Sequence, residues 1–300
     1  MKEKIQITIL SRDRPEYLRK SLDSVLSQRI TDVEIEIVIS DNSEKDEVER
    51  LIGQHYTDSN IKYIRRQPTV SAIEHIHLAA SECKEKYMVI FHDDDIMRPD
   101  YVETMSSFLP KDGVAAVGCN ALAFEDDISK VMYKLHNFTF VKEYKESKEF
   151  LSRYLPGKHG IAPFAGHIYN TKILQKIPID TLMGGKHADV VMMDSLLEYG
   201  SILWLPDILM YCRNHDSNDS GVENIPDQIS LLNYMKKERE LSDLIAFMRY
   251  NIWRRWLLNQ SIKSLLLWKN RIVLKFLLFK SFYFLHKSFF WKALFTRIVK

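Results

Sequence analysis

Three consecutive aspartates form the strongest local concentration of reactive side chains in the sequence. Asp93, Asp94 and Asp95 directly follow the apolar run 87–91, and Pro99 comes shortly afterwards, where the next helix is expected to open. Adjacent carboxylates repel one another, and a divalent cation bound among them removes that cost. A solvated acidic loop is the simpler explanation for an arbitrary triple of aspartates. The position between an apolar strand and a helix favours a metal site here.

The segments around these aspartates alternate between expected strands and expected helices. The expected strands are 5–10, 34–40, 61–65 and 87–91, and the expected helices are 15–26, 44–55 and 70–81. Alternation at this interval predicts a mostly parallel, twisted sheet with helices on both faces. Ligands bind beyond the carboxyl ends of the strands in such sheets. Ser11, Asp41 and the aspartate run all follow strands, so we expect them to lie close together.

The middle of the chain gives weaker patterns. We expect strands at 114–124, 131–141 and 202–205, helices at 145–154 and 188–199, and loops at 157–166 and 178–186. Pro206 should break the strand that precedes it. From about Pro226 to the end the pattern is helical.

Two segments at strand ends resemble family 2 glycosyltransferases with the GT-A fold. The run ITILSRDRPEYL at 7–18 is similar to that family's opening strand and nucleotide-facing loop, and IVISDNS at 37–43 resembles its second strand with a base-binding aspartate. The aspartate run looks like the family's metal-binding motif, with His92 in place of the usual first aspartate. The family often has another aspartate where this chain has Ser40.

The resemblance covers residues 4–110 well, continues loosely to about 216 and stops there. It implies a GT-A-like α/β catalytic domain at 1–220, followed by a helical region at 221–300. It also implies a set of functional residues, whose roles concern the nucleotide, the metal, the diphosphate and the reaction. The expected nucleotide contacts are Ser11, Arg12, Asp41 and Asp93; the metal ligands are Asp94, Asp95 and His215; Arg213 contacts the diphosphate; and Asp189 is catalytic.

The expected reaction explains why these residue types are needed. Cleavage of the anomeric C–O bond of a nucleotide-diphosphate sugar leaves negative charge on the diphosphate, which a divalent cation at Asp94 would stabilise. Carboxylate and phosphate oxygens favour Mn²⁺ or Mg²⁺, whereas zinc would be expected to bring more histidine or cysteine.

The expected base is Asp189, in a segment at 186–191 that resembles the family's catalytic-aspartate region. Asp194 lies five positions further on, which is a rotation of about 140° on a helix, so both cannot readily face one site. A helix cap or first-turn charge is the alternative explanation for Asp189.

Alternation along an extended segment places Tyr211, Arg213 and His215 on one side. Arginine offers a fork for phosphate oxygens, and histidine can donate to phosphate or bind a cation. An exposed polar loop is the alternative. His75, His77 and His167 are weaker candidates, and a structural role for His167 is equally consistent with its position.

Charge is divided sharply along the chain. No acidic residue follows Asp243, whereas residues 249–300 hold twelve Lys and Arg, so the net charge of +2 separates into −10 before the tail and +12 within it. The tail mixes Trp, Phe and Leu with these cations, and no stretch is long enough to span a bilayer. This composition favours the surface of an anionic membrane, with packing on the catalytic domain as the alternative. It is too apolar for a nucleic-acid groove.

We therefore expect an inverting, metal-dependent glycosyltransferase in cell-surface polysaccharide assembly. Its acceptor would be a saccharide, on a lipid diphosphate, and its place the cytoplasmic face of the cell membrane; the sequence leaves oligomerisation open. Three scattered cysteines and no signal peptide are consistent with a reducing compartment. A sugar nucleotidyltransferase would need a glycine-rich loop after the first strand, but the first glycine is Gly53. A non-catalytic nucleotide-sugar or membrane-binding protein is the other alternative.

Overall fold

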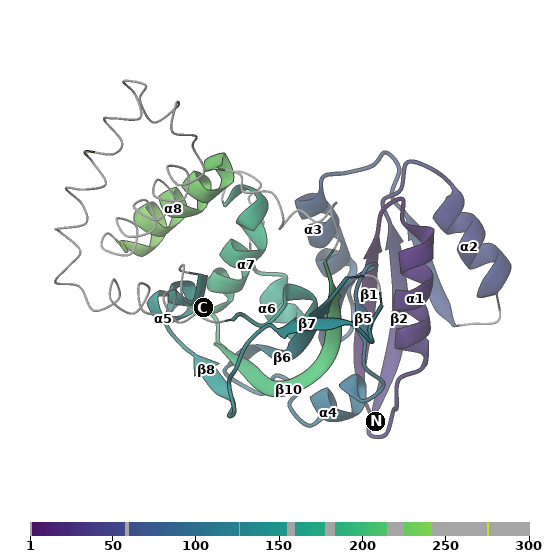
Figure 1. Ribbon diagram of the computed structural model, residues 1–300, viewed down its shortest axis with the longest axis horizontal. Helices are drawn as coiled ribbons and strands as arrows, with labels where there is room; N and C mark the ends of the chain where they lie inside the picture. The colour runs from purple at the N-terminus through teal and green to yellow at the C-terminus, as the bar shows by residue number, and fades with distance from the viewer. Residues whose placement is uncertain are drawn as a thin grey trace. The chain divides into compact units, whose positions relative to one another are not determined.

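A computed structural model describes residues 2–57, 60–125, 127–154, 160–177, 184–214, 225–241 and 275 (Figure 1). The chain divides into two compact units. The first comprises Met1–Lys145, Gly160–Thr181 and Met192–Gly221, and the second comprises Glu146–His159, Leu182–Val191 and Val222–Lys300.

The strands of the described chain all belong to one sheet in the first unit. They are β1 (Glu3–Ser11), β2 (Val33–Asp41), β3 (Ile61–Arg65), β4 (Tyr87–His92), β5 (Ile96–Met97), β6 (Val114–Phe124), β7 (Val131–Lys134), β8 (Lys142–Tyr144), β9 (His167–Asn170) and β10 (Ser201–Arg213). The α-helices are α1 (Pro15–Leu26), α2 (Glu47–His55), α3 (Ala72–Glu82), α4 (Tyr101–Ser106), α5 (Ser147–Leu151), α6 (Thr171–Leu174), α7 (Ala188–Leu196) and α8 (Ile225–Arg239).

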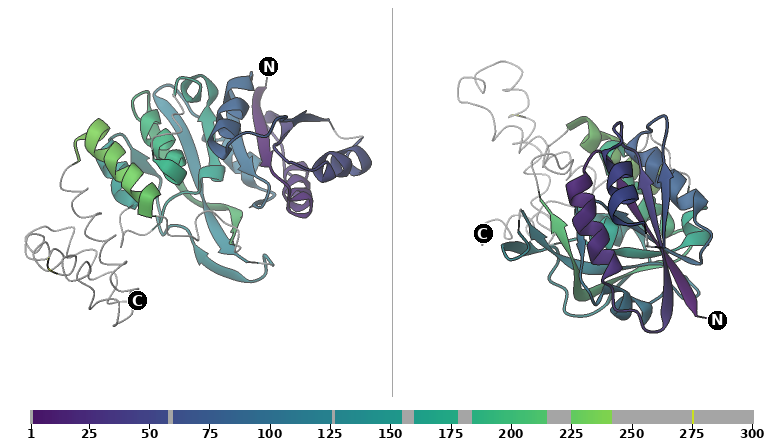
Figure 2. Two further views of the ribbon diagram at one scale, coloured as in Figure 1. Left: turned by 90° about the horizontal axis from the view of Figure 1, so that it is seen from above. Right: turned by 90° about the vertical axis from the view of Figure 1, so that its right-hand side faces the viewer.

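The strand order is β3-β2-β1-β4-β9-β6-β10-β5, with β7 added to β6 and β8 to β10. The first four strands are parallel, and β9 runs antiparallel between β4 and β6. The chain moves from β1 outward to β3 and then crosses back to place β4 on the other side of β1. Right-handed crossovers therefore put α1 and α3 on opposite faces of the sheet, as Figure 2 shows.

Strand β1 is buried at the centre of the parallel part of the sheet. Its neighbours are β2 and β4, and Ile5, Ile7 and Ile9 are at most 1% exposed. Helix α1 begins at Pro15, whose missing N–H is not needed in the first turn, and buries Leu18 and Leu22. The prediction of a mostly parallel α/β sheet is confirmed.

The predicted single strand at 131–141 is wrong. β7 ends at Lys134, and a new strand, β8, begins only at Lys142. The interruption has a clear cause: the Asn120 side chain accepts a hydrogen bond from the N–H of His136 at 3.1 Å and donates to its carbonyl at 2.8 Å. Both backbone groups of His136 are satisfied without a neighbouring strand.

Pro206 does not break its strand, contrary to the prediction. β10 continues through it to Arg213 because the pairing with β6 skips between Trp204 and Ile208. Proline lacks a ladder donor, and an irregularity of this kind removes the need for one. Strand β9 and helix α6 were not predicted.

A buried histidine explains a glycine in β6. His167 donates from Nδ1 to the Pro163 carbonyl at 2.8 Å and accepts from the Trp204 indole N–H at 3.0 Å, which fixes one neutral tautomer. Burial lowers the pKa of His167 to about 4. A Cβ at Gly118 would lie 2.4 Å from His167 Nε2. The structure thus gives His167 a structural role.

We predict that Gly118→Ala destabilises the fold by about 1–3 kcal/mol, because the added methyl group displaces the His167 ring from its two hydrogen bonds. Thermal or urea unfolding measures the effect. Gly53→Ala is the matched control, since its Cβ meets nothing within 4 Å in helix α2, and we expect it to be neutral or slightly stabilising. Equal stability of the two variants would contradict the prediction.

Candidate functional site

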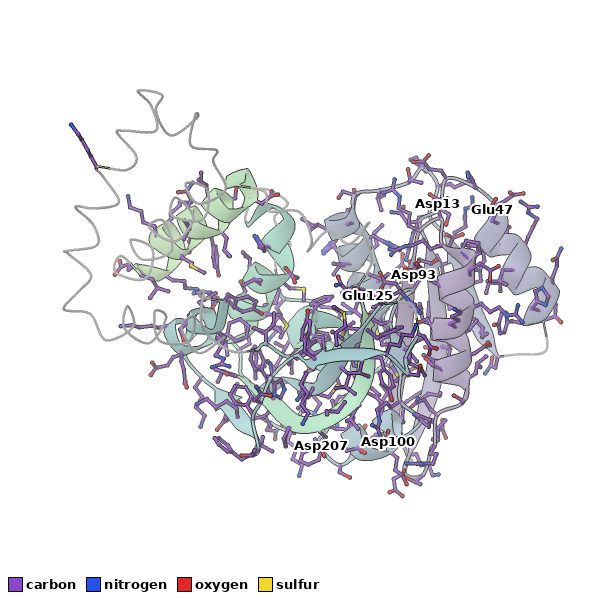
Figure 3. All side chains as sticks on the ribbon, in the orientation of Figure 1. Asp13, Glu47, Asp93, Asp100, Glu125 and Asp207 are labelled. Atoms are coloured by element: carbon purple, nitrogen blue, oxygen red, sulfur yellow. The ribbon has the colours of Figure 1, made fainter. Side chains whose placement is uncertain are left out.

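The strand order reverses at β1 and β4, and in an open α/β sheet a ligand-binding crevice is expected at such a point, beyond the carboxyl ends of the strands. The N–H of Asp93 donates to the Leu10 carbonyl at 3.2 Å, and the N–H of Arg12 donates to Asp93 Oδ2 at 3.1 Å. In Figure 3, Asp93 and Asp13 lie toward the carboxyl end of these strands, whereas Asp100 lies near the other end. The loop after β1 and the loop after β4 are therefore joined by direct hydrogen bonds.

Two arginines hold the aspartate run. Arg14 lies 2.7 Å from Asp94 Oδ2 and 3.3 Å from Asp93 Oδ1. From β10, the N–H of Arg213 donates to Asp95 Oδ1 at 3.0 Å, and its Nε donates to the Asp94 carbonyl at 3.0 Å. These contacts offset the repulsion among the three carboxylates.

Burial still shifts the acidity of the run. It raises the pKa of Asp93 to about 7, an effect that Arg14 opposes, and it raises the pKa of Asp95 well above its usual value, with the Asp94 charge adding to the rise. Both residues are nearly inaccessible, at 0% and 6% exposure. Buried carboxylates with raised pKa values gain from a cation that binds their ionised form.

The donor set fits a hard divalent cation. His92, Asp94 and Asp95 each offer a ligand atom, and these atoms lie within 4.8 Å of one another. Two carboxylates and one imidazole suit Mn²⁺ or Mg²⁺ together with phosphate oxygens. The His92 ring stacks on Phe164, with centroids 5.9 Å apart. His215, which the sequence proposes as a ligand, lies outside the described residues.

Arg213 closes the site from β10. Its guanidinium lies 4.7 Å from the centre of the Tyr17 ring and 4.4 Å from that of Phe124. Besides its bond to Asp94, it donates from Nη1 to the Glu125 carbonyl at 3.1 Å. The two rings and the two carbonyls hold the Arg213 side chain beside the aspartates. The sequence predicts that this side chain contacts a diphosphate.

Asp41, the expected base contact, ends β2 beside Ser11, with which it is paired in the sheet register. Its carboxylate is fully buried and accepts from the Ser43 N–H at 2.9 Å and from the Tyr63 hydroxyl at 2.6 Å. Arg65 forms an ion pair with it at 3.5 Å. Because Asp41 is fully buried, a direct contact between its carboxylate and a base requires a neighbouring side chain to move.

The loop after β3 is hydrogen-bonded to the loop after β2. Asn42 donates to the Val70 carbonyl and accepts from the Val70 N–H, both at 2.9 Å, and so pairs with it as a second peptide group would. Behind this loop, Arg66 forms two bonds with Glu82 and donates to the Ser40 hydroxyl at 3.0 Å. The Ser40 hydroxyl also lies 2.8 Å from His75 Nε2. The side chain where the family often has an aspartate thus belongs to a buried network.

The loop after β1 is tied to the loop after β2. Asp13 adopts a positive φ of 53°, its N–H donates to the Ser43 hydroxyl at 2.7 Å, and its carboxylate accepts from the N–H groups of Glu44 and Lys45. Aspartate tolerates this left-handed conformation better than most residues do. The turn directs Arg12 outward, where its side chain pairs with Glu44 at 3.2 Å.

Asp189 and Asp194 differ in exposure. Asp189 is half-buried at the start of α7 and belongs to the second unit, whereas Asp194, in the part of α7 that belongs to the first unit, is 0% exposed. Of the two carboxylates, only that of Asp189 is accessible to solvent. The basic tail lies outside the described residues, except for Lys275. Within the described residues, no helix is long and apolar enough to cross a membrane.

The structure adds residues to those proposed from the sequence. His92 joins the cluster of possible metal ligands, Arg14 binds two of the aspartates, and Tyr63 and Arg65 surround Asp41. His92 was recognisable by its place in the motif. Nothing in the spacing of Tyr63 and Arg65 shows that alternate side chains of β3 reach the end of β2, which depends on the sheet register.

A crevice of this kind, at the carboxyl ends of a mostly parallel sheet with an aspartate run after β4, defines the GT-A class of glycosyltransferases. The match to a family model is direct. The chain belongs to glycosyl transferase family 2, whose model matches residues 7–178. No curated protein sequence matches the chain.

Solved structures share the fold at low sequence identity. S. aureus TarS 1-349 in complex with UDP-GlcNAc is 11% identical with a TM-score of 0.64, over 87% of this chain and 77% of that one. This chain covers only 46% of a longer TarS structure. The mannosyltransferase PcManGT from Pyrobaculum calidifontis, in complex with GDP-Man and Mn²⁺, is 11% identical with a TM-score of 0.53, over 99% of this chain and 85% of that one.

We predict that His75 makes the stability of the protein depend on pH. Burial and the nearby Arg66 charge lower the pKa of His75 to about 4, whereas the unfolded chain binds a proton near pH 6.5. Stability is therefore full above pH 6.5 and falls as pH drops toward 4, by up to about 3 kcal/mol from this group. His75→Gln should flatten the curve of unfolding free energy against pH.

His55→Gln is the control, because this histidine lies exposed at the end of α2. Its curve should run parallel to that of the wild type between pH 4 and 6.5. If His75→Gln also runs parallel, the buried histidine does not titrate as its surroundings require.

Proposed function

We propose that this protein transfers a sugar from a nucleotide-diphosphate donor to an acceptor hydroxyl, with inversion at the anomeric carbon. One observation carries the proposal: the end of β1, the end of β2, the aspartate run and the end of β10 converge on one crevice through direct hydrogen bonds. Family membership supplies the reaction class. The structural relatives, solved with UDP-GlcNAc and with GDP-Man, support a donor of this chemical type.

Different residues at the strand ends would contact different parts of the donor. In this proposal Ser11, Arg12, Asp41 and Asp93 contact the nucleoside, and the Tyr63 and Arg65 donors around Asp41 set the polarity of the base pocket. Arg213 faces the diphosphate, because its guanidinium already lies beside the aspartate run.

Asp94 and Asp95 would hold a divalent cation, with His92 from the cluster and His215 as further ligands. Bound there, Mn²⁺ or Mg²⁺ would stabilise the charge of the departing diphosphate. The depth of Asp95 and its bond to the Arg213 backbone keep its carboxylate aimed into the site before any cation arrives. Preorganisation of this kind lowers the cost of assembling the site.

The proposed base is Asp189. As the acceptor oxygen bonds to the anomeric carbon, the bond from that carbon to the diphosphate breaks, and the acceptor proton passes to the Asp189 carboxylate. A carboxylate is too weak to ionise a sugar hydroxyl beforehand, so proton transfer accompanies C–O bond formation. Attack opposite the leaving group inverts the configuration.

The acceptor that we propose is a saccharide on a lipid diphosphate, used in assembly of a surface polysaccharide. Its support is the basic, aromatic tail after Asp243, whose composition suits peripheral attachment to the cytoplasmic face of an anionic membrane. Sedimentation with anionic vesicles tests this part alone. Full-length protein that stays in solution at low salt would refute the membrane attachment and leave the transfer reaction untouched.

A panel of nucleotide sugars tests the transferase itself. With Mn²⁺ we expect slow hydrolysis of one donor, since water can replace the acceptor, and loss of that activity in Asp94→Asn by at least about a hundredfold. Release of nucleoside diphosphate is the measurement. Asp207→Asn is the control, because Asp207 lies toward the opposite end of the sheet (Figure 3). No turnover and no donor binding with any sugar nucleotide would overturn the proposal.

Exchange of the base should affect the rate and spare donor binding. Asp189→Asn keeps the shape of the side chain but cannot take the proton, so we predict a fall in kcat by about two to four powers of ten with donor affinity retained. Asp194→Asn should mainly lower stability, because that carboxylate is fully buried. An inactive, stably folded Asp194→Asn beside an active Asp189→Asn would assign the base to Asp194.

A further inference from the structure

Arg14 contacts two aspartates at the place where we propose that the cation and the donor diphosphate bind. Its guanidinium lies 2.7 Å from Asp94 Oδ2 and 3.3 Å from Asp93 Oδ1. Asp94 belongs to the cluster that can hold a cation, together with His92 and Asp95. Asp94, a proposed ligand of the cation, thus already forms an ion pair with an arginine of the protein.

The contact is charge-assisted on both sides and partly shielded from water. The Asp93 side chain is 1% exposed and that of Asp94 is 13% exposed, whereas the Arg14 side chain remains 37% exposed. Ion pairs with a buried carboxylate are screened less than surface pairs. A divalent cation that binds Asp94 therefore has to compete with this arginine and then repels it.

The Arg14 backbone is anchored, but its side chain has room to move. The residue precedes Pro15 at the start of α1, and its carbonyl accepts from the Leu18 N–H at 3.0 Å. The side chain is 37% exposed, so a rotamer change could carry the guanidinium toward solvent while the α1 backbone keeps its place. The anion that arrives with the cation is the donor diphosphate, whose oxygens match the planar fork of an arginine.

We propose that Arg14 is an exchangeable counter-ion: it neutralises Asp93 and Asp94 while the site lacks a cation, and it transfers to the diphosphate when cation and nucleotide bind together. This inference rests on the proposed metal-dependent use of a nucleotide donor. It gives Arg14 two opposite effects. The arginine weakens binding of the cation alone and strengthens binding of the nucleotide diphosphate once the cation is present.

The same exchange couples the two ligands. Cation alone must break the Arg14 contacts without offering the guanidinium a new partner, whereas the cation and diphosphate together supply one. Each ligand therefore favours the other through this side chain. The site would stay largely free of metal until the donor arrives, and its carboxylates would remain neutralised meanwhile.

Binding measurements on the full chain test the proposal without reference to turnover. Mn²⁺ alone is titrated into wild type, Arg14→Met and Arg14→Gln, and free Mn²⁺ is read by electron paramagnetic resonance. We expect both neutral variants to bind Mn²⁺ about three- to thirtyfold more tightly than wild type. With saturating Mn²⁺, calorimetric titration of UDP and GDP should show at least about tenfold weaker binding in both variants, for whichever nucleotide binds wild type.

Arg29→Met is the matched control, because it also removes an arginine bound to a carboxylate, Glu103, at 2.8 Å on the surface. Both affinities should stay at their wild-type values there. Two neutral replacements of different shape guard against one that does not fold, and thermal unfolding identifies it.

The outcomes distinguish a failure of the Arg14 exchange from a failure of the proposed metal site. Unchanged Mn²⁺ affinity in both neutral variants, or tighter Mn²⁺ with unchanged nucleotide affinity, overturns the exchange and leaves the metal site standing. If neither wild type nor any variant binds Mn²⁺ with or without nucleotide, the proposed metal site fails and the role of Arg14 fails with it.

Discussion

Repulsion among three adjacent carboxylates is the constraint around which the described site is arranged. Asp93, Asp94 and Asp95 follow a buried strand, so they cannot all escape into water. The fold brings positive charge to them from both sides, with Arg14 from the start of α1 and Arg213 from the end of β10. The backbone N–H groups of Arg12 and Arg213 add two hydrogen bonds. Elements far apart in the chain are thereby tied to one short turn.

The sheet topology makes this arrangement possible. β1 and β4 are neighbours although 75 residues separate Ser11, the last residue of β1, from Tyr87, the first of β4. The helices α1, which follows β1, and α3, which precedes β4, lie on opposite faces of the sheet. The aspartate turn lies at the carboxyl ends of these two strands, where it is hydrogen-bonded to Leu10 and Arg12. Strand β10 contributes only because it passes Pro206 through an irregular register with β6 and so extends as far as Arg213. A strand ending at the proline would have left Asp95 without its backbone donor.

Local patterns were sufficient for the first half of the fold and insufficient for the rest. The run 5–10 and the helix after Pro15 are confirmed because apolar periodicity and a proline at the first helical turn are local signals. The predictions for 131–141 and Pro206 failed because side-chain hydrogen bonds from Asn120 and a skipped strand pairing determine the structure there, and both depend on partners distant in the sequence.

The aspartate run of the site was recognisable from a local sequence pattern. The ring of donors around Asp41 was not, since it depends on which residues of β3 stand beside β2. The functional roles of all the site residues, Asp189 and His215 among them, remain predictions.

The pairing of Asn42 with Val70 has a thermodynamic consequence for donor binding. A loop that became ordered only when its ligand binds would cost roughly 1–2 kcal/mol of free energy, through lost backbone entropy, for each residue fixed. Here the amide of Asn42 already fixes the loop after β3, and the Ser40–Arg66–Glu82 network supports it from behind. Association with the proposed nucleotide donor would then cost little backbone entropy at this loop, which is one of the several costs that reduce affinity.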